Sequence, residues 1–282
     1  MMANAFSVEG WVMAGRQWDG QSAEGAGHLL AAVAAMARQA GEVVLRHYAD
    51  PACAVCQKPD GTPLTTADEA ADALLRAALL RLTPDIPVVT EECVGQLTDA
   101  QRAGSFWLVD PLDGTREFIA HNGEFTINIA LIVRTEPVLG VVHAPALDRL
   151  FAGAQGQGAW LDDGGSQRPI RCQPPASQGL RMVASRSHGD AHLLAGFLAG
   201  RPLLSLACAG SSLKFGLVAA GEADLYPRLG RTMEWDTAAG HAVLWAAGGQ
   251  VRTLEGAVLA YGKPGFVNPG FVAQGWSGVC GV

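Results

Sequence analysis

A short apolar run that passes directly into two aspartates, a proline and a glycine constrains this chain more than any other segment. Phe106-Trp-Leu-Val109 has the composition of a buried strand, and Asp110-Pro-Leu-Asp-Gly-Thr115 follows without a break. Pro111 fixes one backbone angle of the turn, and Gly114 permits a conformation that other residues avoid. We therefore predict a strand that ends at Asp110, a tight turn, and a helix that begins after Gly114.

The two aspartates of this turn suit the binding of a charged ligand. Carboxylates at positions i and i+3 across a turn can point to one side, so Asp110 and Asp113 are expected to face one volume. Backbone N–H groups at the start of the following helix favour an anion. Asp, Pro and Gly are also common in ordinary turns, so this motif alone leaves a purely structural role open.

Further acids stand at the ends of predicted elements elsewhere in the chain. Glu91 and Glu92 follow a strand predicted at 87–90. Asp236 stands at the start of one predicted helix, and Asp68 lies in the first turn of another. Taken singly, Asp236 is an ordinary helix cap and Asp68 a favourable first-turn acid. If the carboxylates converge, they repel one another unless cations lie among them, and oxygen-rich sites of this kind are those that Mg²⁺ prefers.

The order of predicted elements divides the chain into two domains after an N-terminal extension at residues 1–26. Residues 27–174 hold two helices followed by successive strands, which favours an α+β domain. Residues 175–282 alternate strand and helix, which favours an α/β domain. The boundary is placed at residues 173–179, where two prolines interrupt the pattern.

Local patterns give further structural predictions. Apolar residues at helical spacing predict a helix from Ala26 to Tyr48, and another helix is predicted at 191–199. Thr66-Ala-Asp-Glu69 is a capping-box pattern that predicts the start of a helix. Residues 153–158 have the glycines of a dinucleotide-binding loop but no following helix, so we predict a turn between antiparallel strands.

Charge and hydropathy exclude several classes of protein. The chain has 27 acidic and 20 basic side chains, a net charge of −7, which argues against binding of nucleic-acid polymers. It shows no signal peptide and no uninterrupted apolar run that predicts a membrane span. We expect a cytoplasmic protein, and leave peripheral association with the inner membrane open. Cys53 and Cys56 form a single close pair, which predicts free thiols and leaves a redox or metal role undecided.

Three motifs resemble, in this order, the signatures of the Mg²⁺-dependent, lithium-sensitive inositol monophosphatase superfamily. They are Glu91-Glu92, Asp110-Pro-Leu-Asp-Gly-Thr115 and Trp235-Asp-Thr-Ala-Ala-Gly240, and the similarity covers nearly the whole chain. Within it, the bacterial CysQ-type 3′(2′),5′-bisphosphate nucleotidases have motifs similar to Gly114-Thr-Arg-Glu-Phe118, Ser185-Arg-Ser-His188, Gly210-Ser-Ser-Leu-Lys214 and Leu225-Tyr-Pro-Arg228. Arg116 stands where Lys is usual in that branch, which keeps the charge.

This resemblance implies a two-domain αβαβα layered sandwich, α+β in its first half and α/β in its second, with the metal site between the domains. It implies one Mg²⁺ held by Glu91, Asp110 and the Leu112 carbonyl, and a second held by Asp110, Asp113 and Asp236. The N-terminal domain would carry most of these ligands. Water would attack phosphorus in line, with no phosphoenzyme.

The same resemblance implies roles for residues around the metals. Thr115 and Asp68 correspond to a dyad that takes the proton of the attacking water. Glu92 is implied either behind the metal ligands or in the water shell of a third Mg²⁺. The residues implied in substrate binding are Glu91, Leu112, Asp113, Gly114, Thr115, Ser185, His188, Ser211, Ser212, Lys214, Arg228 and Asp236.

The implied activity is hydrolysis of adenosine 3′,5′-bisphosphate, a small-molecule substrate, to AMP and phosphate, which would link the protein to sulfate assimilation. An inositol or sugar monophosphatase with the same metals is the alternative enzyme. A catalytically inactive binder of phosphorylated metabolites is a third possibility, which the complete set of motif acids and Thr115 disfavours. The sequence does not decide the oligomeric state, and a homodimer stays open.

Overall fold

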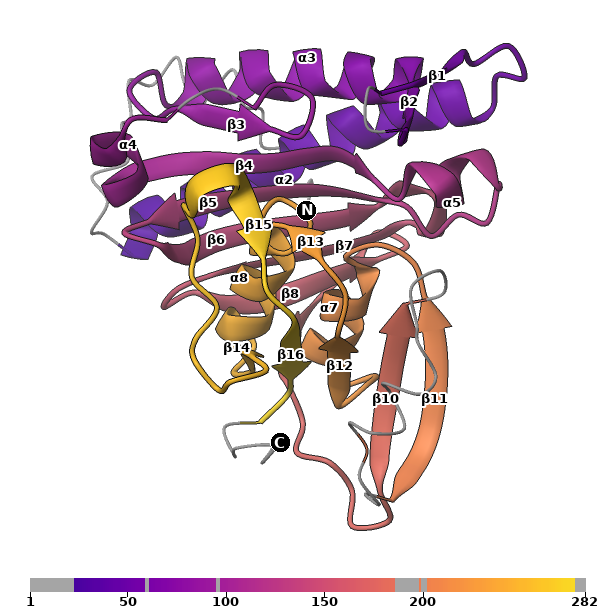
Figure 1. The fold of residues 1–282 in the computed structure, drawn as a ribbon, viewed down its shortest axis with the longest axis vertical. Helices are drawn as coiled ribbons and strands as arrows, with labels where there is room; N and C mark the ends of the chain where they lie inside the picture. The colour runs from indigo at the N-terminus through magenta and orange to yellow at the C-terminus, as the bar shows by residue number, and fades with distance from the viewer. Residues whose placement is uncertain (1–22, 59–60, 95–96, 186–197, 199–201, 277–282) are drawn as a thin grey trace, which may run out of the picture.

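Helices and sheets alternate in stacked layers through the molecule (Figure 1). This computed structural model describes residues 23–58, 61–94, 97–185, 198 and 202–276. Most of the N-terminal extension, and the helix predicted at 191–199 apart from Leu198, lie outside these residues. The first long helix begins at Ala23, so the last four residues of the predicted extension belong to it.

Most of the observed helices match helices predicted from the sequence. They are α2 (Ala23–Tyr48), α3 (Thr66–Leu82), α4 (Asp99–Ala103), α5 (Thr115–Ile119), α7 (Leu213–Ala219) and α8 (Ala238–Ala246), with short 3₁₀ turns η1 (Pro145–Leu147) and η2 (Pro264–Phe266).

Two larger sheets carry most of the strands. The first comprises β3 (Val88–Thr90), β4 (Ser105–Asp113), β5 (Thr126–Val133), β6 (Glu136–Ala144), β7 (Arg149–Ala154), β8 (Gly158–Asp163) and β9 (Ser166–Ile170), in that order across the sheet. Only β3 and β4 are parallel among these neighbours. The turn between β7 and β8 confirms the prediction for residues 153–158.

The second sheet has the order β11-β10-β12-β16-β14. Its strands are β10 (Leu180–Ser185), β11 (Leu203–Ala209), β12 (Leu225–Arg228), β14 (Gln250–Thr253) and β16 (Phe271–Gln274). β10 runs parallel to β11 and β12, whereas β16 is antiparallel to both of its neighbours. Two small ribbons pair β1 (Val55–Gln57) with β2 (Pro63–Thr65), and β13 (Thr232–Met233) with β15 (Val267–Asn268).

Two large cores hold these layers together. One lies between α2, α3 and the outer face of the first sheet, and the other surrounds α7 and α8 between the two sheets. Leu29, Val33 and Met36 of α2 are fully buried in the first core. Residues 25–48 are long and apolar enough to cross a membrane by length and composition, and 56% of an apolar 18-residue window within them is buried inside the protein. The same properties are typical of a core helix, which is how α2 packs here.

Glycines allow α8 to lie directly on the first sheet. A Cβ atom on Gly140 of β6 would lie 2.3 Å from the Ala239 carbonyl oxygen, and one on Gly153 of β7 would lie 2.8 Å from the Ala246 Cβ. Real Cβ atoms do not approach this closely, so only glycine permits the contact. Backbone packing therefore fixes the start of α8 relative to the first sheet.

The capping box of α3 lies one residue earlier than predicted. The N-cap is Thr65, and its backbone N–H and hydroxyl donate to Asp68 Oδ2 at 2.8 and 2.5 Å. The Asp68 carboxylate closes the box, whereas Glu69 does not take part. This fixes Asp68 in a buried position, 2% exposed. Nearby, Cys56 is exposed in β1, and Cys53 Sγ lies 3.5 Å from Thr66 Oγ1.

Candidate active site

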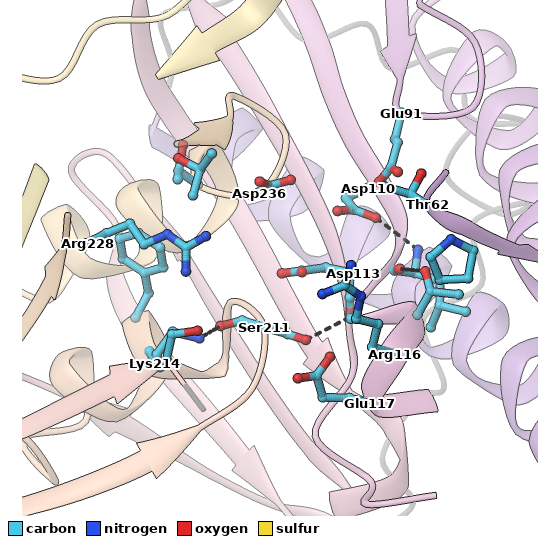
Figure 2. A pocket seen from close by; sticks show the side chains of 18 of the residues that line it. Thr62, Glu91, Asp110, Asp113, Arg116, Glu117, Ser211, Lys214, Arg228 and Asp236 are labelled. Carbon is cyan, nitrogen blue, oxygen red and sulfur yellow. Dashed lines mark hydrogen bonds between the residues drawn. The ribbon is translucent and has the colours of Figure 1, made fainter. Parts of the chain in front are cut away.

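A cavity of about 280 Å³ lies where the first sheet meets the second half of the chain (Figure 2). Of the predicted site residues, those that line it are Glu91, Asp110, Leu112, Asp113, Gly114, Thr115, Ser185, Ser211, Lys214, Arg228 and Asp236. Asp68, Glu92 and Ser212 lie behind this lining, and His188 lies outside the described residues. The structure thus brings together side chains separated by more than 140 positions in the sequence.

A bulge at the end of β4 points its two aspartates toward the cavity. Asp110 pairs with Asn128 of β5 and Asp113 pairs with Thr126, so β4 has one more residue than its partner between these pairs. The predicted strand end at Asp110 was therefore wrong, because the strand continues through the bulge to Asp113. The helix predicted after Gly114 is α5.

Gly114 is required by both conformation and space. Its φ is 91°, in the left-handed region, and a Cβ atom would lie 2.1 Å from Ser211 Oγ. Ser211 also has a positive φ, 48°, and its hydroxyl donates to the Asp113 carbonyl at 2.8 Å. The turn before α7 therefore sits directly on the turn before α5.

Three carboxylates from different elements converge in the cavity. One oxygen each from Glu91, Asp110 and Asp236 lies within 4.8 Å of the others. Glu91 follows β3, Asp110 lies in β4, and Asp236 precedes α8. The Leu112 N–H donates to Asp110 Oδ1 at 3.1 Å, and the Met233 N–H donates to Asp236 Oδ2 at 2.8 Å. Each aspartate is thus oriented by its own backbone and keeps its other oxygen for a ligand.

The convergence makes this cluster favour positive charge. Burial, and then the charges of its acidic neighbours, raise the pKa of Asp110 well above its ordinary value. Burial and the adjacent Asp113 raise the pKa of Asp236 to about 8. A divalent cation among these oxygens would remove the repulsion, and carboxylate oxygens are ligands that Mg²⁺ prefers. The residues therefore fit a divalent metal ion.

Asp113 is held from the other side of the cavity. Its Oδ2 accepts hydrogen bonds from the Ser212 N–H and hydroxyl, both at 2.8 Å, and from Asn128 Nδ2 at 3.1 Å. Ser212 Oγ also lies 2.6 Å from the Asp236 carbonyl oxygen. Ser212, predicted to bind substrate, is 2% exposed and does not line the cavity, because its hydroxyl is engaged with these two acidic residues.

Asn128 was missed by the sequence analysis. It is 1% exposed, and Nδ2 also donates to Ser212 Oγ at 2.8 Å. Its signal was a polar side chain in the apolar run Ile127-Asn-Ile-Ala-Leu131. Such a residue in a buried strand needs polar partners, because burial without hydrogen bonds is costly.

The predicted dyad residues are in contact. Thr115 Oγ1 donates to Asp68 Oδ1 at 3.3 Å, while Asp68 Oδ2 accepts the two bonds from Thr65. Burial raises the pKa of the Asp68 carboxyl, against the lowering effect of Thr65. The capping box thus leaves one carboxylate oxygen of Asp68 directed at Thr115.

Lys58 is a second residue that the sequence analysis missed. Its Nζ lies 2.6 Å from Glu91 Oε1 and 2.7 Å from Glu92 Oε1. Burial lowers the pKa of Lys58, but the hydrogen bonds and charges of both glutamates outweigh it and raise the pKa. Burial raises the pKa of Glu92 to about 7. Lys58 follows β1 in a loop rich in Pro and Gly, where no pattern indicates a contact with residues more than 30 positions away.

The opposite side of the cavity carries two cations with different surroundings. Lys214 is 2% exposed, and its ammonium donates to the carbonyls of Ser211 and Ala209 at 2.5 and 3.2 Å. It also lies 5.1 Å from the ring centre of Tyr226, and burial lowers its pKa to about 8. Lys214 is therefore engaged with the turn that carries Ser211.

The Arg228 guanidinium donates fewer hydrogen bonds to the protein than the Lys214 ammonium does. Figure 2 shows it pointing into the cavity across from Asp110. Nη2 donates to the Arg231 carbonyl at 3.2 Å, and Nε is buried with no hydrogen-bond partner among the described residues. The guanidinium itself lines the cavity, so this side chain suits an anion there.

Comparison with known proteins identifies relatives over most of the chain. Residues 27–277 match the model of the inositol monophosphatase family. The 3′(2′),5′-bisphosphate nucleotidase CysQ of Escherichia coli (strain K12) is 44% identical over 248 residues, which cover 86% of this chain and 98% of that protein. The protein of the same name from Haemophilus influenzae is 33% identical over 261 residues, covering 88% of this chain and 93% of that protein.

Solved structures give the same result. CysQ from Bacteroides thetaiotaomicron superposes with a TM-score of 0.72 at 36% identity, covering 86% of this chain and 96% of that chain. The IMPase of Thermotoga maritima superposes with a TM-score of 0.71 at 25% identity, covering 86% and 90%.

Proposed function

The chain belongs to the inositol monophosphatase family, and we propose that it is a 3′(2′),5′-bisphosphate nucleotidase, which removes the 3′-phosphate of adenosine 3′,5′-bisphosphate to give AMP and phosphate. This activity would link it to sulfate assimilation. The observation that carries the proposal is the pairing, in one cavity, of converging carboxylates with the guanidinium of Arg228 on the opposite side. A substrate with two phosphate groups can place one near the carboxylates and the other near Arg228.

The carboxylates would hold two Mg²⁺ ions. Glu91, Asp110 and the Leu112 carbonyl form one proposed ligand set, and Asp110, Asp113 and Asp236 form the other. A third ion near Glu92 is an alternative that we leave to measurement. When bound, the ions lower the pKa of water and neutralise charge on the phosphate and the leaving oxygen.

The dyad supplies the proton transfer in this proposal. Thr115 Oγ1 receives a proton from the attacking water as it passes its own proton to Asp68 Oδ1, the oxygen it contacts. Burial of Asp68 favours the protonated product of this step. The N–H groups of Gly114 and Thr115, at the start of α5, bind the phosphate that is released.

The second phosphate of the nucleotide is assigned to Arg228. The Arg228 guanidinium, which lines the cavity, would form charge-assisted hydrogen bonds with that phosphate. Ser185 and Ser211, which also line the cavity, would contact the nucleotide. Lys214 contributes positive charge there while its ammonium holds the Ser211 turn.

Phosphate release with Mg²⁺ tests the proposed function. The purified protein is assayed on adenosine 3′,5′-bisphosphate and on inositol 1-phosphate at equal concentrations. A kcat/KM that favours the nucleotide supports the proposal. A preference for inositol 1-phosphate would assign the monophosphatase activity instead, and no release from either would leave a binding protein.

We infer a cytoplasmic location, with surface association with the inner membrane left open, because the nucleotide substrate is a small soluble molecule. A homodimer is a further prediction, which size-exclusion chromatography with light scattering would test.

A further inference from the structure

A lysine ammonium already occupies part of the proposed metal site. Lys58 Nζ lies 2.6 Å from an oxygen of Glu91, which is one of the three converging carboxylates, and 2.7 Å from an oxygen of Glu92. Its side chain is only 15% exposed. Distances this short between charged groups indicate charge-assisted hydrogen bonds.

The charge balance around the cluster gives this contact its importance. Glu91, Glu92, Asp110, Asp113 and Asp236 lie in or next to the proposed ligand sets. Among the ion pairs formed by the described residues, those that involve one of these five carboxylates are made by Lys58. Lys58 is thus the cation in direct contact with the acidic cluster among the described residues, and it sits on a proposed metal ligand.

We propose that Lys58 is the internal counter-ion of the metal-free site and that divalent cations bind in competition with its ammonium. The inference rests on the metal site of the proposed function. Glu91 offers the same negative charge to both, so a strong ion pair with Lys58 weakens the attraction of Glu91 for Mg²⁺. Lys58 thereby sets the Mg²⁺ concentration at which the site fills.

The sign of the effect follows from electrostatics. Removing a positive charge a few ångströms from a divalent ion strengthens binding of that ion, even with the high effective dielectric constant near a protein surface. We expect Lys58→Met to tighten Mg²⁺ binding about three- to tenfold. A residue that only orients Glu91 would have the opposite effect, because its loss would leave the ligand misplaced.

Isothermal titration calorimetry on protein stripped with EDTA tests this without any activity measurement. Mg²⁺ is titrated into wild type, Lys58→Met and Lys58→Gln, the last in case the Met variant folds poorly. Lys58→Arg keeps the charge and should bind Mg²⁺ as wild type does. The melting temperature of the metal-free Met variant should fall, because the remaining carboxylates lose their counter-ion.

Arg149 offers a matched control. Its guanidinium also bridges two carboxylates, Asp163 and Glu222, and it lies in β7, three strands from β4 and so roughly 14 Å away across the sheet. Arg149→Met removes the same charge beyond the range of strong interaction, and should leave Mg²⁺ affinity within about twofold of wild type.

The outcomes separate this inference from the proposed function. If the wild type binds Mg²⁺ and Lys58→Met binds it equally or more weakly, the competition is refuted and the metal site stands. If the wild type itself does not bind Mg²⁺, the metal site of the proposed function fails, and the competition fails with it.

Discussion

The two sides of the cavity carry opposite charge and are held in different ways. On the acidic side, Asp110 and Asp236 are oriented by backbone N–H groups but remain mutually repelling. On the cationic side, Lys214 donates two hydrogen bonds to backbone carbonyls, whereas the Arg228 guanidinium donates one, and its buried Nε has no partner among the described residues.

This difference shows that charge alone does not identify a ligand-binding residue. Lys214 and Arg228 are equivalent in the sequence analysis, but their hydrogen bonds separate them. An ammonium that already holds two carbonyls organises the site, and a guanidinium that lines the cavity and donates one hydrogen bond to the protein gains most from a ligand. The acidic side differs again, because all its members gain from the same cation.

The largest expected effect comes from removing a charge on the acidic side. Asp113→Asn should lower kcat by at least a thousandfold, because a metal ligand loses its charge while its volume is unchanged. The measurement is kcat on the bisphosphate at saturating Mg²⁺, with circular dichroism as the control for folding. Near-normal turnover would contradict the role assigned to Asp113.

Truncation on the cationic side should have a smaller and selective effect. Arg228→Ala should lower kcat/KM for adenosine 3′,5′-bisphosphate about ten- to a hundredfold, mainly through KM, since a hydrogen bond to a charged group contributes about 1.5–3 kcal/mol. Activity on inositol 1-phosphate should change much less.

Lys214→Ala is the variant to compare with Arg228→Ala. Because the Lys214 ammonium holds the turn that contacts Asp113, this variant should lose activity on both substrates. Equal losses for Arg228→Ala on both substrates would remove the distinction between the two cations.

The acidic side should also make the protein more stable when Mg²⁺ is present. A ligand at a hundred times its Kd adds about 2.7 kcal/mol to the free energy of unfolding, which corresponds to a rise in Tm of roughly 5 °C for a chain of this size. Thermal melts in EDTA and in Mg²⁺ measure the difference. Identical curves would contradict a cation site among these carboxylates.

The smallest expected effect is a pH dependence confined to the metal-free protein. The pKa of Asp236 is raised to about 8, so the native state binds more protons than the unfolded chain up to that pH. The contribution of Asp236 to the free energy of unfolding is therefore complete below the pKa near 4 of the unfolded chain, and it is lost as the pH rises toward 8.

Urea unfolding in EDTA between pH 6.5 and 8 measures this effect. Glu92, whose pKa is raised to about 7, adds to it in the same direction, and Lys214, whose pKa is lowered to about 8, acts in the opposite direction. His143 and His241, whose pKa values burial lowers to about 4 and about 3, are neutral in the native state over that range. In the unfolded chain they are about half protonated at pH 6.5 and neutral by pH 8, which offsets part of the fall. The free energy of unfolding should fall by about 1 kcal/mol in EDTA and much less in Mg²⁺. A rise with pH in EDTA would contradict the assignment.

Much of the fold was predictable because it depends on local patterns. The periodicity of α2, the turn between β7 and β8 and the start of α5 after Gly114 each follow from a few neighbouring residues. The bulge in β4 did not, since it is defined by pairing with Asn128 and Thr126 on another strand. The capping box shifted by one residue because Thr65 and Thr66 are chemically equivalent in sequence.

The site was predictable where chemistry is carried by acids in motifs. Glu91, Asp110 and Asp236 do converge, although their individual roles stay predictions. Lys58 could not be found, because its contact depends on where a loop between short strands is placed in space. The burial of Ser212 depends in the same way on packing between the two halves.

The contact of α8 with Gly140 and Gly153 has a consequence for tolerance to mutation. Because backbone meets backbone there, the spacing between the two sides of the cavity does not depend on the size of the surrounding core side chains. Exchanges such as Leu for Ile or Met elsewhere in the core can alter stability while the width of the cavity is retained. A single methyl group at either glycine would instead push α8 outward and carry Asp236 with it. These two glycines therefore set the distance between α8 and the first sheet, and with it the position of Asp236 in the active site.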